Sequence, residues 1–159
     1  MICFESGTNR FNYRIVGVAV HEDSVLLHRA EYEAFWTFPG GRAEFGETAD
    51  ETLRREMREE LGLEVEVVRL LWFVENFFSY DGKRYHEIAL YFLMRLPEAC
   101  DLLQHKGPFH SEDAGTPLIF QWFQRSPQTL SNLPLLPAFL QTAVQHLPES
   151  IERMIHYDH

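Results

Sequence analysis

Three glutamates near the middle of the chain have a spacing that suits a metal site. Glu59 and Glu60 follow Glu56 by three and four residues, so on an α-helix the three side chains share one face. On an exposed helix, like charges at this spacing cost only about 0.2–0.5 kcal/mol per pair. Near a core edge the local dielectric falls and the repulsion increases. Because carboxylates are hard ligands, the pattern predicts Mg²⁺ or Mn²⁺ there; a solvated acidic face is the alternative.

An arginine and a glycine-containing loop accompany these carboxylates. Arg55 stands one turn before Glu59 and one turn after Glu51, where a planar guanidinium can hold Glu59 in one rotamer. The loop from Gly40 to Gly46 contains three glycines, and the backbone N–H groups of such a loop can approach an anion closely. We therefore expect a phosphate group to bind between this loop and the helix.

The carboxylates require a helix, and the sequence predicts one over residues 49–61. Thr48 and Glu51 fit a capping box at its start. Gly62 suits the left-handed residue that ends many helices. An apolar stripe lies about a quarter-turn from the glutamates and is expected to pack on a sheet; it consists of Leu53, Met57 and Leu61.

The remaining elements are expected to be mainly strands. Residues 83–95 are apolar in both alternating sets, which indicates a strand covered on both faces and favours an α/β fold with a sheet between helices. Residues 102–116 are polar and are expected to form a loop. The expected strands are 14–20, 25–27, 36–38, 64–79, 83–95 and 118–123, and the expected further helices are 135–145 and a short one from residue 149.

The segment from Gly41 to Leu63 resembles the signature of the Nudix hydrolases, a MutT-like family. That signature reads Gx5Ex7REUxEExGU, where U is aliphatic, and every specified position is matched. Met57 replaces the usual Leu, Ile or Val, and methionine is apolar and flexible enough to fill the slot. The matching residues are Gly41, Glu47, Arg55, Glu56, Met57, Glu59, Glu60, Gly62 and Leu63.

The resemblance implies a Nudix fold, an α/β/α sandwich around a mixed β-sheet, over a single domain of residues 1–159. It also implies Mg²⁺-dependent cleavage of the pyrophosphate linkage in a nucleoside diphosphate derivative, such as a nucleoside triphosphate, sugar nucleotide or dinucleotide. Some proteins keep this fold as nucleotide-sensing or binding modules, usually with degraded signatures, so a binding module is the alternative.

Site roles follow from the same resemblance. Glu56, Glu59 and Glu60 are expected to bind the metal, with Gly41 contributing to the site. Glu59 is expected to double as the base for the attacking water, and Arg55 to orient it. Other candidate bases are Glu112 and Asp113 in the expected loop and Glu87 in a strand. Substrate contacts are expected from the backbone of the loop and from aromatic rings that stack on a base: Gly40, Gly41, Trp36 and Phe38.

Composition limits the partners of the chain. Its net charge of −10 disfavours a DNA duplex. No apolar run approaches the ~20 residues of a membrane helix, and the first residues lack the pattern of a signal peptide. We therefore expect a cytoplasmic protein with a nucleotide as its small-molecule substrate. The apolar surplus of residues 70–78 predicts a homodimer, and the eight histidines are interpreted as solvated or locally bonded.

Overall fold

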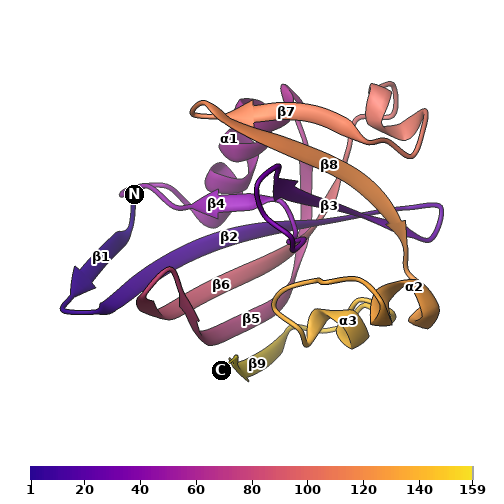
Figure 1. Cartoon of the computed structure of the whole chain (residues 1–159). Coiled ribbons are helices and arrows are strands. Elements are labelled where there is room, and N and C mark those ends of the chain that lie inside the picture. Colours follow the sequence, from indigo (N-terminus) through magenta and orange to yellow (C-terminus); the bar gives the residue numbers. More distant parts are fainter. Residues whose placement is uncertain (159) are drawn as a thin grey trace.

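A computed structural model describes residues 1–158 and contains a large mixed sheet with few helices (Figure 1). Within this range the strands along the main path follow the order β7-β8-β3-β2-β6-β5-β9, and β1 and β4 pair with β2. β2 runs parallel to β6, and β5 runs parallel to β9, while the other pairs are antiparallel. The strands are β1 (Cys3–Ser6), β2 (Asn9–His21), β3 (Ser24–Ala30), β4 (Gly40–Arg42), β5 (Glu66–Tyr80), β6 (Lys83–Arg95), β7 (Phe109–Asp113), β8 (Thr116–Gln124) and β9 (Glu152–Tyr157).

Helices cover both faces of the sheet, which confirms the expected α/β/α sandwich. Helix α1 (Ala49–Leu61) packs Leu53 and Met57 on one face, against Ile15 of β2. The short helices α2 (Pro127–Ser131) and α3 (Leu140–Ala143) pack on the other face, where a second apolar core includes Val16. Because strand side chains alternate in direction, β2 supplies residues to both cores in turn.

Helix α1 begins and ends where the sequence predicts. The Thr48 hydroxyl accepts a hydrogen bond from the Glu51 backbone N–H, and the Glu51 side chain accepts one from the Thr48 N–H, which completes the capping box. Gly62 ends the helix with φ 65°, and its N–H donates to the Arg58 carbonyl. The helix that carries the signature is therefore fixed at both ends by local sequence.

Two hairpins are also as expected from the sequence. β2 and β3 are joined through Glu22 and Asp23, both at positive φ, and β5 and β6 are joined through Asp81 and Gly82, also at positive φ. Such two-residue connections match the twist of antiparallel strands. The expected strand at 36–38 is wrong in part, because Trp36 and Thr37 form only isolated bridges, and the regular strand here is β4.

The expected loop at 102–116 is wrong. It contains a single 3₁₀ turn, η1 (Asp101–Leu103), and then β7, which pairs antiparallel with β8. Polar residues can form β7 because it is an edge strand whose stability comes from pairing with β8 rather than from an apolar face of its own. Consequently Glu112 and Asp113 lie at the end of a strand instead of in a loop.

The C-terminal expectations also require correction. The expected helix at 135–145 is reduced to α3, preceded by a segment that contains Pro134 and Pro137, and α2 was not predicted. The expected short helix after residue 149 is wrong, since this segment forms β9 along the edge of β5. Pairing with an existing sheet edge outweighs weak local helix propensity in so short a segment.

Candidate active site

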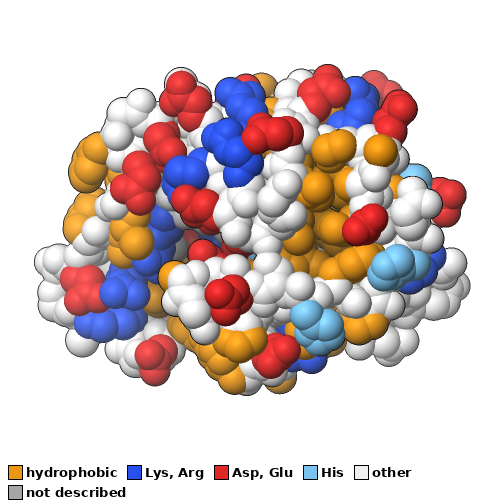
Figure 2. Space-filling model, turned by 90° about the horizontal axis from the view of Figure 1, so that it is seen from above, with side chains coloured by type: hydrophobic (Ala, Val, Ile, Leu, Met, Phe, Trp, Pro, Cys, Tyr) orange, Lys and Arg blue, Asp and Glu red, His pale blue; other side chains and the backbone are white. Residues whose placement is uncertain are grey.

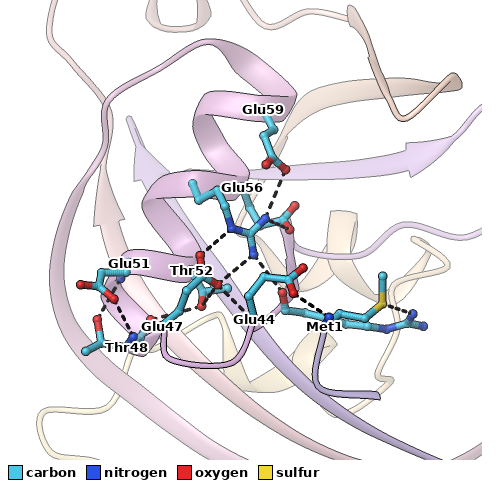
Figure 3. Close-up of polar contacts among 10 residues, drawn as sticks. Met1, Glu44, Glu47, Thr48, Glu51, Thr52, Glu56 and Glu59 are labelled. Carbon is cyan, nitrogen blue, oxygen red and sulfur yellow. Dashed lines mark hydrogen bonds and ion pairs between the residues drawn. The ribbon is translucent and has the colours of Figure 1, made fainter. Parts of the chain in front are cut away.

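The guanidinium of Arg55 connects the carboxylates of α1 with the loop before it. Figure 3 shows Glu47, Glu56 and Glu59 directed toward this group. Hydrogen bonds from Arg55 reach Glu47 Oε2 at 2.6 Å, Glu56 Oε1 at 2.9 Å, the Arg42 carbonyl at 3.1 Å and Glu59 Oε2 at 3.3 Å. The bond from Arg55 lowers the pKa of Glu47 to about 2. Arg55 thus fixes Glu56 and links α1 to β4 and the loop.

Three carboxylates meet beside this arginine. Ligand oxygens of Glu56, Glu60 and Asp113 all lie within 4.8 Å of one another. Glu56 and Glu60 lie on successive turns of α1, whereas Asp113 lies at the end of β7. β7 is held on the helix because the Ser111 hydroxyl donates to the Glu60 carbonyl. The fold therefore brings a third carboxylate to the two from the signature.

The close negative charges of these three carboxylates require a cation for compensation. Burial, followed by the neighbouring charges of Glu56 and Asp113, raises the pKa of Glu60 to about 9. Burial also raises the pKa of Glu56, although Arg55 opposes this. Among residues 1–158, no group donates a hydrogen bond to the buried Glu60 Oε2. Like charges at such separation in a dry site cannot all ionise without compensation, and three convergent hard oxygens fit Mg²⁺ or Mn²⁺.

Gly41 makes room for the Glu56 carboxylate. A Cβ atom at this position would overlap the carboxyl group of Glu56, and a Cβ at Gly40 would overlap the Ile15 carbonyl. Both glycines belong to β4, which pairs with β2. Their absence of side chains is a steric requirement of the site rather than a need for unusual backbone angles.

We expect Gly41→Ala to disrupt this site. The added methyl group displaces Glu56, so the affinity for Mg²⁺ or Mn²⁺ should fall by about 10- to 100-fold, the range seen when ligand orientation is lost. Isothermal titration calorimetry with each cation measures the change. Gly7→Ala is the control, because a Cβ at Gly7, in the turn between β1 and β2, would meet nothing within 4 Å and this residue does not line the cavity described below; equal affinity in both variants would contradict the assignment.

A cavity of about 510 Å³ extends from the carboxylates over the sheet. Its wall includes Glu56, Glu60 and Asp113 at one end, together with Gly40 and Gly41. Figure 2 shows the molecule from above the view of Figure 1. On one half of the visible surface acidic and basic side chains are mixed around a hollow, and on the other half there is a hydrophobic area. The volume falls in the range of small-molecule sites.

Other residues expected from the sequence lie at different distances from this cavity. The Glu59 side chain is 50% exposed and is not among the residues of the cavity wall. Trp36 lies outside the wall too, with its ring edge-on to Phe123 and under Arg29. Phe38 belongs to the wall, but its ring is buried in the core beside Tyr91.

The three other candidates for the general base differ in their position relative to the cavity. Glu112 is exposed and absent from the cavity wall, whereas its neighbour Asp113 belongs to the carboxylate group. Glu87 lines the same cavity but is not part of the carboxylate group, and its Oε2 accepts a hydrogen bond from Asn12 Nδ2 at 2.9 Å. Of the three, Asp113 is the one that the fold places with Glu56 and Glu60.

Sequence reasoning did not find two cationic or titratable residues of this cavity, Arg14 and His28. Arg14 donates to the Phe38 carbonyl at 3.0 Å and lines the wall. It occupies the same alternating set of β2 as buried Val16 and Val18. A charged side chain in a core-facing register is the signal that was available in the sequence.

The histidines were interpreted as solvated or locally bonded, and for His28 the first of these is wrong because the residue is buried. Its ring packs at 5.2 Å from Phe120, and its Nδ1 finds no hydrogen-bond partner among residues 1–158. Burial, and then the charge of Arg14, lowers the pKa of His28 to about 3. The folded protein therefore keeps this imidazole neutral.

This burial predicts acid destabilisation. Because the folded-state pKa lies below the ordinary value of 6.5, the unfolded chain binds the proton first as the pH falls. The free energy of unfolding should thus decrease by about 2 kcal/mol between pH 7 and pH 5 on account of His28. Urea denaturation at both pH values checks this: His28→Gln should lose that part of the dependence, and the exposed-site control His86→Gln should keep it. An unchanged pH dependence in His28→Gln would refute the prediction.

Comparison with known proteins agrees with this site. A family model described as the NUDIX domain matches residues 12–124, which is well over half of the chain. The matched region contains most of β2 and all of β3 to β8 with α1. The chain therefore belongs to the Nudix family, as its signature and fold indicate.

Individual relatives share different parts of the chain. A putative mutator protein MutT4 of Mycobacterium tuberculosis (strain CDC 1551 / Oshkosh) is 40% identical over 60 residues, 38% of this chain but only 24% of the relative's length. An 8-oxo-dGTP diphosphatase of Buchnera aphidicola subsp. Schizaphis graminum is 21% identical over 147 residues, covering 90% of this chain and 95% of the relative. The chain thus spans about a quarter of the first relative and nearly all of the second.

Solved structures share the fold. A mutator MutT protein of Bacillus halodurans superposes with a TM-score of 0.60 at 22% identity, covering 92% of this chain and 90% of that one. At this identity the likeness establishes the arrangement of elements. Among the described residues no helix combines the length and apolar character needed to span a bilayer.

Proposed function

We propose that this chain hydrolyses the pyrophosphate linkage of a nucleoside diphosphate derivative with the help of Mg²⁺ or Mn²⁺. The observation that carries the proposal is the convergence of Glu56, Glu60 and Asp113, with Glu60 buried, in the wall of a nucleotide-sized cavity. The intact signature in α1 and the NUDIX match support it. Relatives whose names describe diphosphatases or pyrophosphohydrolases support the same reaction class.

The cation would be held by Glu56, Glu60 and Asp113, whose oxygens already converge. A divalent ion in such a site supplies positive charge that neutralises phosphate oxygens and makes a water molecule more acidic. Arg55 positions Glu56 through the bond at 2.9 Å. The backbone of Gly40 and Gly41 forms the adjoining wall, close enough to accommodate phosphate groups.

Two carboxylates are candidates for the general base. Glu59 has the position that the family resemblance suggests, at the rim and held at 3.3 Å by Arg55. Asp113 lies inside the carboxylate group. We propose Glu59 as the base, because the family resemblance gives it this role and it is not one of the three carboxylates that converge to hold the ion. Arg14, one of the arginines of the cavity wall, is suited to bind the negative charge of the substrate.

The test is a turnover screen with Mg²⁺ or Mn²⁺ over nucleoside triphosphates, sugar nucleotides, dinucleotides and capped or triphosphorylated RNA. Phosphate or pyrophosphate release that requires the cation supports the proposal, and ¹⁸O-water identifies the attacked phosphorus. Glu66→Gln, an exposed glutamate paired with Arg95 on β6, is a matched control that should retain activity. Tight nucleotide binding without turnover of any substrate would instead support a binding module.

We also propose that the protein is a cytoplasmic homodimer, as the sequence predicts. The edge of β5 is paired with β9, whose own outer edge pairs with no strand within residues 1–158. β9 bears Ile155, which is 50% exposed. Static light scattering at micromolar concentration should give twice the chain mass, and Ile155→Lys should give the monomer mass. A wild-type monomer would reject the dimer; cell fractionation tests the location.

A further inference from the structure

Three buried polar residues form a row across the floor of the cavity. Asn12 of β2 is the register partner of Glu87 in β6, and Glu87 is the partner of Asn76 in β5. Paired residues on adjacent strands project to the same face of a sheet. Each of the three is only 4–5% exposed, and all three line the cavity. The sequence separates them widely, so only the sheet brings them together.

In this row it is hydrogen-bond acceptors that lack partners. Asn12 Nδ2 donates to Glu87 Oε2, and this fixes the orientation of the Asn12 amide, because a carboxylate accepts hydrogen bonds and donates none. Within residues 1–158, the Oδ1 atoms of Asn12 and Asn76 receive no hydrogen bond. Glu87 has capacity beyond the one bond from Asn12. Buried acceptors are rarely left without donors, so the row is complementary to a ligand that donates.

Aromatic rings limit the shape of that ligand. Phe78 and Tyr85 stack on each other at 4.6 Å, and both belong to the same cavity wall as the row. Tyr80 meets Tyr85 edge-on at 6.5 Å. Aromatic side chains beside a few fixed polar groups are typical of small-molecule sites and suit a flat heterocycle, which can stack on the rings.

The row also lies at a suitable place relative to the metal site. Asn12 precedes Ile15 by three residues on β2, and Ile15 pairs with Gly41 beneath the Glu56 carboxylate. At about 3.3 Å per residue, the row and Gly41 are separated by about 10 Å along the strand. Arg14, two residues after Asn12 on β2, lines the same cavity. Alternation along β2 directs Asn12 and Ile15 to opposite faces, but the row lines the same cavity as Gly41 and Glu56, so a nucleotide with its phosphates at the carboxylates reaches the row with its base.

We propose that Asn12, Glu87 and Asn76 recognise the base of the substrate, and that they select a guanine-type edge. The proposal rests on the function proposed above and adds its base specificity. Guanine places an imino N–H next to an amino group, which together offer three N–H donors to a carboxylate and an amide oxygen. Adenine has one amino group beside an acceptor nitrogen, and uracil has carbonyls on both sides of its N–H, which an acceptor row repels. Glu87 then determines which nucleobase binds and is not the general base that activates the attacking water.

Calorimetric binding of nucleoside monophosphates tests the proposal without turnover. Wild-type protein should bind guanosine monophosphate at least tenfold more tightly than inosine monophosphate, which lacks the amino group, and more tightly still than adenosine monophosphate. Glu87→Gln should lower guanosine monophosphate affinity by about tenfold and change adenosine monophosphate affinity little. The matched control is Glu75→Gln, the preceding β5 position, whose carboxylate pairs with exposed Arg153 and should leave binding unchanged.

Several results would overturn this assignment. Equal affinity for the three monophosphates contradicts it, and so does a preference that follows the ribose 2′-hydroxyl rather than the base. If Glu87→Gln lowers kcat equally for all nucleotides and leaves base preference intact, the residue acts in catalysis instead. Should Glu87→Gln fail to fold by circular dichroism, Asn76→Ser provides the same comparison. Base-selective binding without hydrolysis would reject the proposed reaction alone, and metal-dependent hydrolysis without base preference would reject the row alone.

Discussion

Glu60→Gln is expected to lower metal-dependent kcat/KM by roughly three orders of magnitude, because a cation contributes several kcal/mol of charge stabilisation to the reaction. The side chain is 4% exposed and shares its site with Glu56 and Asp113. An amide keeps the shape of the side chain but provides one neutral oxygen in place of the charged group. Phosphate release from the preferred nucleotide in saturating Mg²⁺ measures the loss.

In the metal-free protein, Glu60→Gln is expected to increase the free energy of unfolding. The folded-state pKa of Glu60, about 9, lies above the ordinary 4.5, so the folded protein binds the proton more tightly than the unfolded chain. With a chelator present, the free energy of unfolding of the wild type should fall as the pH rises from about 4.5 to about 9. Glu60→Gln should lack this decrease and be the more stable protein at pH 8. Full activity together with wild-type pH dependence would remove Glu60 from the site.

The second large effect is expected from Arg55. Arg55→Ala removes the bonds to Glu47, Glu56 and Glu59 at once, leaving partly buried carboxylates without their partner. Because the Arg55 side chain is 23% exposed, we expect a loss of about 2–4 kcal/mol in the free energy of unfolding, below the range for fully buried pairs. Turnover should fall by about 100-fold, since Glu56 loses its fixed orientation.

Two further variants, Arg55→Lys and Arg58→Ala, separate the contribution of Arg55 to stability from its contribution to turnover. A lysine retains the charge but cannot reach three carboxylates and a carbonyl in fixed directions, so it should recover stability more than kcat. Arg58 is on the same helix, 49% exposed and 3.6 Å from Glu64, and its replacement should change little. Chemical denaturation and steady-state kinetics on the three variants provide both readouts. If Arg58→Ala is as harmful as Arg55→Ala, the effect is a general one of helix charge.

Local sequence predicted the elements whose signals are local. The ends of α1 depend on Thr48, Glu51 and Gly62, which act within a few residues, and the turn at Asp81 and Gly82 is equally self-contained. β9 was mispredicted because it exists only by pairing with the distant strand β5, and β7 because it is a polar edge strand that pairs with β8 and has no apolar alternation of its own. Tertiary pairing of this kind outweighs the propensity of a five- or six-residue segment.

The same distinction holds for the site. Glu56 and Glu60 were predicted because their spacing on one helix is visible in the sequence, as was the role of Arg55 in holding Glu59. Asp113 was one of two adjacent candidates, and only the strand direction of β7 decides between them. Glu87 was predicted only as a candidate base, and its alignment with Asn12 and Asn76 gave no signal, since strand register is not determined by any short stretch of sequence.

The contribution of β7 to the carboxylate group makes the site depend on the whole fold. Asp113 reaches α1 only after the β7–β8 hairpin has joined β3, a contact between segments far apart along the chain. Such long-range pairings form late because the entropy of closing the intervening loop must be overcome first. A fragment that ends before the hairpin would carry the entire 23-residue signature and still lack cation affinity. Cation affinity is therefore a sensitive indicator that folding has been completed.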